Sequence, residues 1–520
     1  MSIRLRNISS RWQRKQKILS VIVVFSFIAI LTASMNRQIT DSPATKDGYE
    51  NLSAAYNLAY HGVISVRNLA LGQESDLSPT DYREPLPIIF LAAYIKLIPG
   101  LSSSLTADTI NEGSALIAVK LHNLIWASSC LLGVALAILL SIRSPLVGTV
   151  VSVIALALTY KYYFDRWDIV DSTYTELQAS TLLVWSSIML IIALKTGRPI
   201  WFIATGILVG ALALTKALFL YVGLGLIITL LLIYLVRPPE WGRWGTVSRV
   251  GLIAISLMAV TIPWMVRNFI YFHTFEITQR NGMALLIRAY NNQMSDDEYR
   301  GAFYVYAPPF LQDWIGEWLG FKPEDLEKGG RLQRLNEKSR WPEEAFSFYR
   351  SAQAEWMRLQ IYYRDEGATD PSHLAERASR REAKQLILSN PLRHLKMSVV
   401  FMWRGMWAMR ANRNLMTVCV NALAFLSIGV MALLGLVRRD AVLIGIALLP
   451  VGAIIFLALF SDFIPRYMSI TIPNMVIALS ISTTWIASWL GAQIGQNFNF
   501  QSLQITSSNN STKKGIKFNA

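Results

Sequence analysis

The stretch ILSVIVVFSFIAILTASM (18–35) is predominantly apolar and long enough to form a membrane helix. A helix needs about 20 apolar residues to cross the hydrocarbon core of a bilayer. A secretory signal would have a shorter apolar core and a clearer cleavage site of small residues. We therefore expect 18–35 to be a retained first transmembrane helix, and 1–17 to be a cytoplasmic tail. The tail is basic because it contains Arg4, Arg6, Arg11, Arg14, Lys15 and Lys17.

Similar apolar runs recur along the 520 residues of the chain. Hydrophobic residues make up 53% of the sequence and charged residues 16%, whereas soluble domains carry about 25% charged residues. The sequence therefore predicts an all-α polytopic membrane protein with about ten transmembrane helices. Nine further spans are expected near 118–141, 145–162, 177–194, 199–215, 218–236, 250–266, 415–437, 441–460 and 468–490.

The loops between these spans alternate in charge. One set of loops and the tail carry the basic residues Arg143, Lys195, Arg198, Arg237, Arg243, Arg249, Arg438, Arg439, Lys513, Lys514 and Lys517. Cytoplasmic loops are enriched in Lys and Arg. We therefore expect both termini in the cytoplasm and the acidic loops outside. The predicted location is the inner, cytoplasmic cell membrane, with the active site facing the periplasm or cell exterior.

Two hydrophilic regions interrupt the spans and are expected on the outer side. The first, 36–117, contains PLPIIFLAAYIKLIPG (85–100), which is too short to span comfortably and reads as an interfacial or re-entrant helix. The second, 268–414, is predicted to be a small helical segment. The remaining regions are a transmembrane bundle at 118–267, C-terminal transmembrane helices at 415–490 and a disordered cytoplasmic tail at 491–520.

Within the second outer region, three stretches are expected to be helical. The stretches 342–363 and 371–390 each have proline at an N1-like position, and the second stops before Pro391. The stretch HLKMSVVFMWRGMWAMR (394–410) is aromatic and basic, as is typical of a helix that lies at the membrane interface. These helices would be juxtamembrane elements on the outer face.

Composition also limits the classes of function. The net charge of +15 is explained by the basic cytoplasmic loops, and no basic patch on a soluble face indicates a nucleic-acid partner. Cys130 and Cys419 both lie in apolar runs and give no disulfide or metal pattern. The spans contain few mid-membrane ionisable residues, whereas an ion-coupled transporter usually has them. Ionisable residues gather instead at the outer ends of the spans.

Asp47 opens the stretch DGYENLSAAYNLAYHG (47–62) directly after the first span. A structural interpretation makes Asp47 the N-cap of a helix and Glu50 the N3 residue of a capping box. A chemical interpretation makes Asp47 a carboxylate that acts at the membrane surface. Both interpretations are open from these residues alone.

Other charged residues stand at the same outer level. Arg83 and Glu84 precede the short apolar helix, where they are either a polar anchor or the rim of a lipid-accessible cavity. Asp171 and Glu176 crowd the entry of one span, and helix N-termini favour acids there. Lys216, Arg267 and Arg466 lie at outer span ends. These cations either extend to lipid headgroups or hold a phosphate through charge-assisted hydrogen bonds.

Taken in order, these pieces resemble one family. The chain is similar to the GT-C class of integral-membrane glycosyltransferases, in particular the protein O-mannosyltransferases and the aminoarabinose transferase of lipid A. The resemblance rests on the following residues: Asp47, Tyr49, Ala55, Asn57, Leu58, Gly62, REPLP (83–87), TELQAS (175–180), TK (215–216), PWMVRN (263–268), Asn281, Gly282 and RYMSITIP (466–473). The chain has Arg83, Glu84, Pro85 and Leu86 where the aminoarabinose transferases have a Lys-Pro-Pro-Leu type motif.

The resemblance implies a polyprenyl-phosphate-linked sugar donor and a hydroxyl acceptor on a protein, lipid or polysaccharide. It also implies a catalytic base at Asp47, with Asp171 or Glu176 as a second acidic group. Lys216 resembles a lysine that lies near the donor phosphate in the family. We expect Arg267, Arg466 and Arg83 to bind the same phosphate, and Tyr49, Glu84 and Tyr467 to line the substrate pocket.

A good leaving group is already present in a glycosyl phosphate, so the site has to supply a base and cations. We therefore expect an inverting single displacement. A divalent metal held by Asp47 and another carboxylate is an open alternative, although the sequence shows no metal-ligand cluster. Two other functions are also open: a non-enzymatic transporter or flippase of lipid-linked glycan, and an O-antigen ligase or polymerase.

Overall fold

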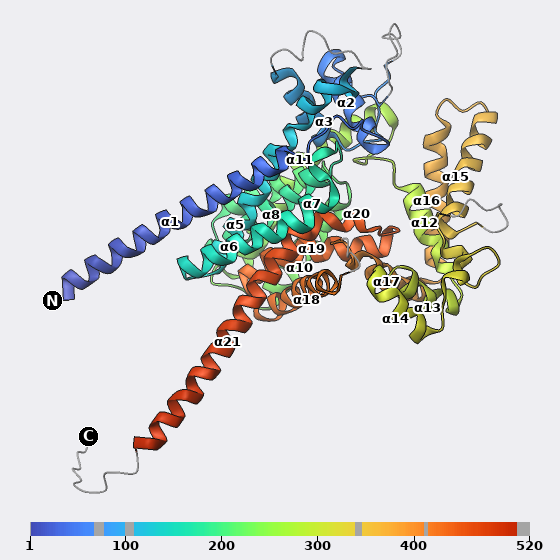
Figure 1. The fold of residues 1–520 in the computed structure, drawn as a ribbon. Coiled ribbons are helices and arrows are strands. Elements are labelled where there is room, and N and C mark those ends of the chain that lie inside the picture. The colour runs from blue at the N-terminus through green and yellow to red at the C-terminus, as the bar shows by residue number, and fades with distance from the viewer. Residues whose placement is uncertain (1, 67–76, 99–108, 339–345, 410–413, 507–520) are drawn as a thin grey trace.

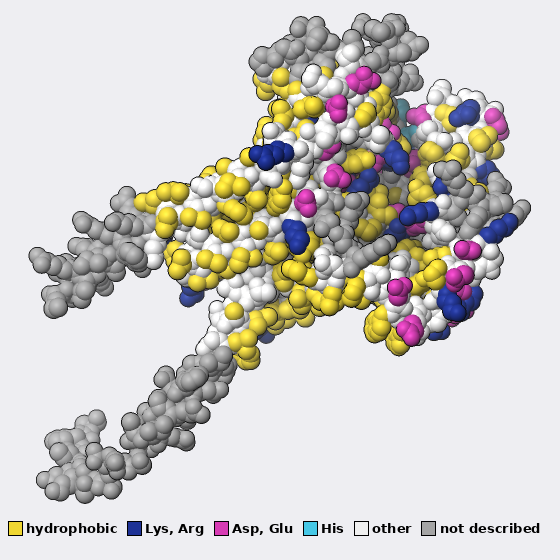
Figure 2. Space-filling model, in the orientation of Figure 1, with side chains coloured by type: hydrophobic (Ala, Val, Ile, Leu, Met, Phe, Trp, Pro, Cys, Tyr) yellow, Lys and Arg dark blue, Asp and Glu magenta, His cyan; other side chains and the backbone are white. Residues whose placement is uncertain are grey.

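A computed structural model describes residues 2–66, 77–98, 109–338, 346–409 and 414–506. Within these ranges the chain is helical and contains no β-strand. Apolar side chains cover the visible sides of the bundle, whereas charged side chains gather near residues 47–97 and over residues 282–406 (Figure 2). The chain is an all-α polytopic membrane protein, as the sequence predicts.

Nine helices in the described ranges are long and apolar enough to cross a membrane. Six of them are single α-helices, and the other three each combine two consecutive helical elements. In chain order they comprise α1 (Ser2–Asn36), α4 with α5 (Gly113–Lys120, His122–Ser141), α6 with η3 (Pro145–Thr159, Tyr160–Phe164), α8 (Glu176–Thr196), α10 (Leu218–Val236), α11 (Gly242–Phe272), α18 (Leu415–Arg438), α19 (Ala441–Phe460), and α20 with α21 (Pro465–Met468, Ile472–Thr506).

The tenth expected span is α9, Pro199–Ala213, which has only 15 residues. α9 packs closely on α8 and α11. A Cβ atom on Gly206 would lie 2.5 Å from the backbone oxygen of Ile253, and one on Gly210 would lie 2.8 Å from Val260 Cβ. Small residues allow the backbones of membrane helices to approach in this way. The glycines therefore explain how α9 is held in the bundle despite its length.

The centre of the bundle is α8, whose most apolar window is 83% buried. It contacts α5, α9 and α19. One polar contact inside the bundle joins α21 to α8, since Asn474 Nδ2 donates to Ser187 Oγ at 2.9 Å. α8 begins at Glu176, and the segment just before it contacts residues 48 and 51.

The first outer region folds as two packed helices, α2 (Asp47–His61) and α3 (Pro85–Leu97). Leu52 and Tyr56 of α2 share a buried cluster with Ile88 and Ile95 of α3. The predicted short helix at 85–100 is confirmed from 85 to 97, while 99 and 100 lie outside the described residues. Backbone hydrogen bonding joins α3 to the bundle, because Leu86 N donates to Leu214 O at 3.1 Å.

The described part of the second hydrophilic region, 268–414, contains six α-helices. They are α12 (Gly282–Tyr290), α13 (Asp296–Val305), α14 (Pro309–Leu319), α15 (Phe348–Asp365), α16 (Pro371–Ser389) and α17 (Pro391–Met406). α16 begins at Pro371 and ends before Pro391, as predicted. α15 begins at Phe348, and residues 342–345 of the predicted stretch lie outside the described ranges.

Figure 1 shows that α1 begins, and the ribbon of α21 ends, on the side of the bundle away from α2–α3 and from α12–α17. α21 continues to Thr506, so the helix extends beyond the boundary expected at 490. Residues 507–520 of the predicted disordered tail lie outside the described residues. The two hydrophilic regions thus share one end of the molecule, and the start of α1 and the end of α21 share the other.

Candidate active site

Asp47 is the first residue of α2, not its N-cap. The N-cap position belongs to Lys46, which has a φ of 49° and makes no capping hydrogen bond through its side chain. The expected capping box is also wrong, because Glu50 accepts from Arg83 rather than forming the reciprocal cap. The positive end of the helix dipole still favours an anion at this position. The Asp47 carboxylate is therefore available for contacts with other parts of the chain.

The start of α2 is fixed against the segment that leads into α8. Thr173 Oγ1 donates to Gly48 O at 2.7 Å, and Asn51 Nδ2 donates to Thr173 O at 3.0 Å. A Cβ atom on Gly48 would lie 2.7 Å from Thr173 Oγ1, so glycine is needed for this approach. These contacts place Asp47 near the N-terminus of α8.

Three arginines from three distant segments surround the Asp47 carboxylate. Arg83 Nη2 lies 2.8 Å from Oδ1, and Arg280 Nη2 lies 2.9 Å from the same oxygen. Arg466 Nη2, from α20, lies 3.0 Å from Oδ2. One carboxylate thus collects charge-assisted hydrogen bonds from three guanidinium groups.

Arg83 and Arg280 are themselves held by neighbours. Arg83 Nε donates to Glu50 Oε2 at 2.8 Å, and the Arg83 side chain is 7% exposed. The Arg280 guanidinium carbon lies 4.9 Å from the centre of the Tyr82 ring, a cation–π arrangement. The two arginines therefore have defined positions.

The backbone around Arg280 is fixed by α16. Glu376 Oε2 accepts from the backbone nitrogen of Gly282 at 2.6 Å and from that of Met283 at 3.1 Å. These two nitrogens are unpaired donors at the start of α12, and a carboxylate satisfies them well. Glu376 therefore holds the helix that follows Arg280.

A second carboxylate, Glu176, joins the same group. Lys216 Nζ lies 3.2 Å from Glu176 Oε1, and Arg466 Nε lies 3.5 Å from it as an ion pair. Glu176 is 2% exposed, and its other oxygen is buried without a hydrogen-bond partner in the described part of the chain. Arg466 thus links Glu176 to Asp47.

We call these seven residues the Asp47 cluster: Asp47, Glu50, Glu176, Arg83, Lys216, Arg280 and Arg466. Four cations face three carboxylates, so the formal charge of the cluster is +1. The excess cation and the unpartnered Glu176 oxygen leave the group incompletely paired. A site of this kind has charge available for an anionic ligand.

The cations determine the ionisation of Asp47. Burial by itself raises the pKa of this carboxyl, but the charges and hydrogen bonds of Arg280 and Arg83 outweigh burial and hold the pKa well below its usual range. Asp47 is therefore ionised at neutral pH. While the arginines bind it, the carboxylate is a weak base, because its lone pairs are engaged by strong donors.

Two expected site residues lie outside the Asp47 cluster. Asp171 Oδ1 is bound by Lys120 Nζ at 2.8 Å, and its Oδ2 accepts from Thr40 Oγ1 at 2.7 Å. Arg267 donates to Thr80 O at 2.8 Å, and its guanidinium carbon lies 4.6 Å from the centre of the Trp264 ring. No contact among the described residues joins either side chain to Asp47.

The three expected pocket residues lie beside the cluster. Tyr49 follows Asp47 by two residues on α2 and is partly buried. Glu84 Oε1 accepts from the backbone nitrogen of Ala217 at 3.5 Å, next to Lys216. The guanidinium carbon of Arg466 lies 5.6 Å from the centre of the Tyr467 ring. Whether these side chains touch a substrate stays a prediction.

Arg280 and Glu50 are cluster members that the sequence analysis did not select. Arg280 stands immediately before Asn281 and Gly282, which belong to the family pattern, so its position was a usable signal. Glu50 was assigned only to the helix cap. Its spacing of three residues from Asp47 gave an equally good indication that the two carboxylates share one face of a helix.

The cluster does not fit a divalent cation. The described residues contain no group of three or more His, Cys, Asp or Glu side chains that could hold a metal ion. Three guanidinium groups around Asp47 also repel a metal at that carboxylate. The open alternative of a metal bound by Asp47 and another carboxylate therefore lacks support in this geometry.

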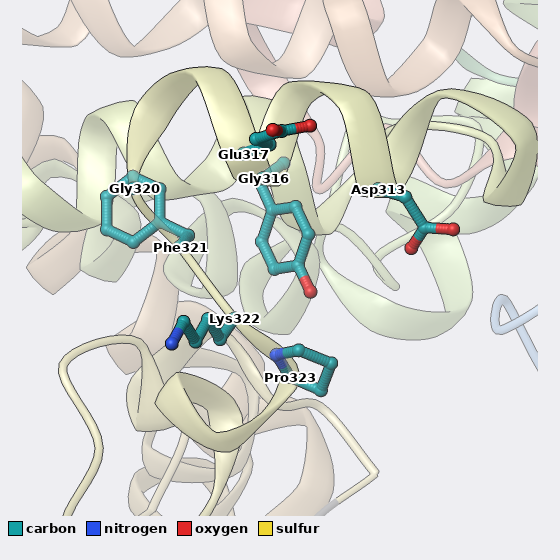
Figure 3. Close-up of a pocket in the computed structure, with 8 residues that line it drawn as sticks. Asp313, Gly316, Glu317, Gly320, Phe321, Lys322 and Pro323 are labelled. Carbon is teal, nitrogen blue, oxygen red and sulfur yellow. The ribbon is translucent and has the colours of Figure 1, made fainter.

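A separate pocket of about 400 Å³ lies in the outer segment. Figure 3 shows Asp313 and Glu317 of α14 on one side and Lys322 and Pro323 on the other. None of its lining residues belongs to the Asp47 cluster. The pocket is therefore a different feature from the candidate active site.

No family model and no curated protein sequence matches this chain. Among solved structures, the oligosaccharyltransferase AglB from Archaeoglobus fulgidus, in complex with an inhibitory peptide and a dolichol-phosphate, is similar with a TM-score of 0.45 at 12% identity. ArnT from Cupriavidus metallidurans, bound to undecaprenyl phosphate, is similar with a TM-score of 0.36 at 13% identity.

The extent of these similarities is unequal. The match to AglB covers 94% of this chain and 52% of that protein, so the chain spans about half the length of the archaeal enzyme. The match to ArnT covers 88% of this chain and 77% of that protein. Both neighbours are GT-C glycosyltransferases. At these scores and identities, neither similarity by itself assigns an activity to this chain.

Proposed function

We propose that this protein is a membrane glycosyltransferase that transfers a sugar from a polyprenyl-phosphate-linked donor to an acceptor hydroxyl. The observation that carries the proposal is the Asp47 carboxylate, which Arg83, Arg280 and Arg466 share. The cations supply a site for a phosphate, and the carboxylate supplies a base. The acceptor hydroxyl belongs to a protein, a lipid or a polysaccharide.

The donor phosphate would compete with Asp47 for the arginines. A glycosyl phosphodiester carries a negative charge and non-bridging oxygens that accept guanidinium hydrogen bonds. Arg466 and Lys216 lie together on Glu176, and Arg280 is 38% exposed, so these cations are well placed to bind it. As the arginines turn to the phosphate, Asp47 loses the contacts that lower its pKa. Donor binding would therefore convert Asp47 from a weak base into a stronger one.

The chemical step is then a single displacement. Asp47 removes the proton of the acceptor hydroxyl, and the acceptor oxygen forms a bond to the anomeric carbon. The bond between the anomeric carbon and the phosphate oxygen breaks, and its electron pair leaves with the polyprenyl phosphate. The arginines stabilise the charge on the leaving phosphate. Attack opposite the leaving group inverts the anomeric configuration.

The proposed membrane orientation places this chemistry outside. The Asp47 cluster lies at the end of the bundle that holds α2, α3 and α12–α17, whereas α1 begins at the other end (Figure 1). The loops at that other end carry the basic residues that favour the cytoplasm, among them Arg143 and Arg439. We therefore assign the cluster to the outer face, where a lipid-linked donor meets a polar acceptor.

The test is sugar transfer by the full chain in lipid nanodiscs, with polyprenyl-phosphate-linked donors whose sugars are radiolabelled. We expect Asp47→Asn to lower transfer by at least about 100-fold, because a positioned base contributes on the order of 10²–10⁴. Asp168→Asn is the matched control, because it changes an exposed carboxylate on the segment before α8, and asparagine tolerates the positive φ of 48° at this position. It should retain transfer per folded molecule within about threefold.

Three results would count against the proposal. Near-normal sugar transfer by Asp47→Asn would contradict the assignment of Asp47 as the catalytic base. Movement of labelled lipid across a vesicle membrane without any covalent product would favour the transporter alternative. Transfer from a polyprenyl-diphosphate glycan, with none from the monophosphate donors, would favour the ligase or polymerase alternative.

A further inference from the structure

Helix α14 of the outer segment carries an exposed aromatic face. Phe310, Trp314 and Trp318 are spaced four residues apart and therefore lie on one side of the helix. They are 41%, 65% and 75% exposed, respectively. The two tryptophan rings are stacked, with centres 6.4 Å apart and planes 10° from parallel. A soluble surface rarely leaves such a set of large apolar side chains in water.

The rest of α14 shows that this exposure is confined to one face. Ile315 and Gly316 are buried, and a Cβ atom on Gly316 would lie 2.8 Å from the backbone oxygen of Phe321. Asp313 and Glu317 line the pocket beside the helix (Figure 3). α14 thus has a packed side, an acidic flank and an aromatic side. This division is typical of a helix that lies at a membrane interface.

Packing connects this helix to the membrane-spanning part of the chain. α14 contacts α13, α13 contacts α17, and α17 contacts the spanning helix α18. Trp403 Nε1 of α17 donates to Phe303 O of α13 at 3.0 Å, which fixes the middle of this series. Figure 1 shows α13, α14 and α17 gathered at the end of the bundle near α18.

Exposed apolar side chains also occur on the other two helices of this series. On α17, Leu392, Leu395 and Val399 are 78%, 54% and 53% exposed. On α18, Leu415 and Met416 at the start of the span are also more than half exposed. A spanning helix presents such residues to lipid. The α14 face is therefore joined by packed helices to a surface that meets the bilayer.

We propose that the Phe310–Trp314–Trp318 face of α14 inserts into the interface of the outer leaflet. Tryptophan is enriched at this depth because its ring is apolar while its N–H is polar. α14 contains no Lys or Arg, so the binding is driven by apolar burial rather than by attraction to anionic lipid. The partner is the headgroup and upper acyl region of any fluid phospholipid bilayer. This proposal is independent of the catalytic assignment.

The test uses the full chain in phosphatidylcholine nanodiscs that hold one copy each. Cys419 is replaced by alanine, and Trp318→Cys then provides a site for an environment-sensitive fluorophore. Cys130 is buried and stays unlabelled. The matched control is Tyr362→Cys on α15, where the native side chain is 51% exposed and the main helix contacts are with α12 and α16.

We expect nitroxide-labelled lipid to quench the label at 318 at least threefold more than the label at 362. Aqueous iodide should instead quench the label at 362 more strongly than the label at 318. Equal iodide quenching at both sites would overturn the proposal. Shielding of the 318 label from both quenchers would also overturn it, because another protein surface would then cover α14. Lipid quenching that appears only when anionic lipid is added would contradict the apolar mode of binding.

Discussion

The Asp47 cluster and the Lys120–Asp171 pair lie near the same end of the bundle but differ in how completely they are paired. Lys120 is fully buried, and its three N–H groups go to Asp171, Thr40 O and Ser42 O at 2.8–2.9 Å. Asp171 in turn accepts from Thr40 N and Thr40 Oγ1, both at 2.7 Å. This pair ties the segment after α1 to the segment before α8.

In the Asp47 cluster the pairing is unequal. Three arginines share one carboxylate, and one Glu176 oxygen has no partner in the described part of the chain. Both sets have short ion pairs between sequence-distant residues. The difference teaches that short distances alone do not mark a functional site. The surplus positive charge of the Asp47 cluster is the feature that supports the proposed anion site, and the Lys120–Asp171 pair lacks such a surplus.

The largest expected effect is the loss of stability when the Lys120–Asp171 ion pair is removed. Asp171→Asn leaves the buried Lys120 charge uncompensated, and removing one member of a buried ion pair costs about 3–5 kcal/mol. We expect a clear fall in the melting temperature of the purified protein, measured by intrinsic fluorescence. The double variant Lys120→Met with Asp171→Leu should recover part of the lost melting temperature, because it leaves no buried charge unpaired. If Asp171→Asn melted normally, the pair would not be a structural tie.

A smaller effect should separate the two candidate phosphate-binding arginines. Arg466→Gln removes a cation from the Asp47 cluster, and we expect kcat/KM for the lipid donor to fall about 30-fold, since hydrogen bonds to charged groups contribute about 1.5–3 kcal/mol. Arg267→Gln is the matched control, because Arg267 binds Thr80 O outside the cluster. It should change kcat/KM less than about threefold. An equal fall in kcat/KM for Arg466→Gln and Arg267→Gln would show that the Asp47 cluster is not the specific site of donor binding.

The smallest effect concerns a carboxylate that has no direct cation partner. Asp81 is 8% exposed, its Oδ2 has no hydrogen-bond partner among the described residues, and burial raises its pKa to about 6. A raised carboxyl pKa means that the folded state binds more protons than the unfolded state between about pH 4 and pH 6. Stability is therefore lost as the pH rises through this window.

Replacing Asp81 by asparagine removes the free-energy cost of ionising this buried carboxyl in the folded protein. We expect Asp81→Asn to melt about 2 °C above the parent protein at pH 7.5, and the gain to vanish near pH 4. Melting curves at a series of pH values would measure the difference. A gain that is equal at both pH values would show that the ionisation of Asp81 is not its source.

Much of the fold could be predicted because membrane helices are encoded locally. Each span is a run of apolar residues whose length matches the bilayer. The weak point was α9, which is shorter than a span and is held by glycine-mediated contacts with α11. Such contacts depend on a helix more than 40 residues away in the sequence, so no local window contains the information.

The site was harder to predict because its members are brought together by the bundle. Asp47, Glu176 and Lys216 were selected and do fall in one cluster. Asp171 and Arg267 occupy similar outer positions but have other partners. The sequence predicts how close a charged residue lies to the end of a span. The direction in which its side chain points, and the residues it contacts, depend on how the helices pack. Arg280 is different, because its position directly before Asn281 and Gly282 of the family pattern gave a sequence signal.

The wide sequence separation of the Asp47 contacts has a consequence for biosynthesis. Arg466 pairs with Asp47 across 419 residues. A ribosome makes the chain from its N-terminus at about 5–20 residues per second. The carboxylate is therefore translated long before α20 exists. The protein acquires its complete ionic centre only when its last membrane helices are inserted, and a nascent or truncated chain lacks it.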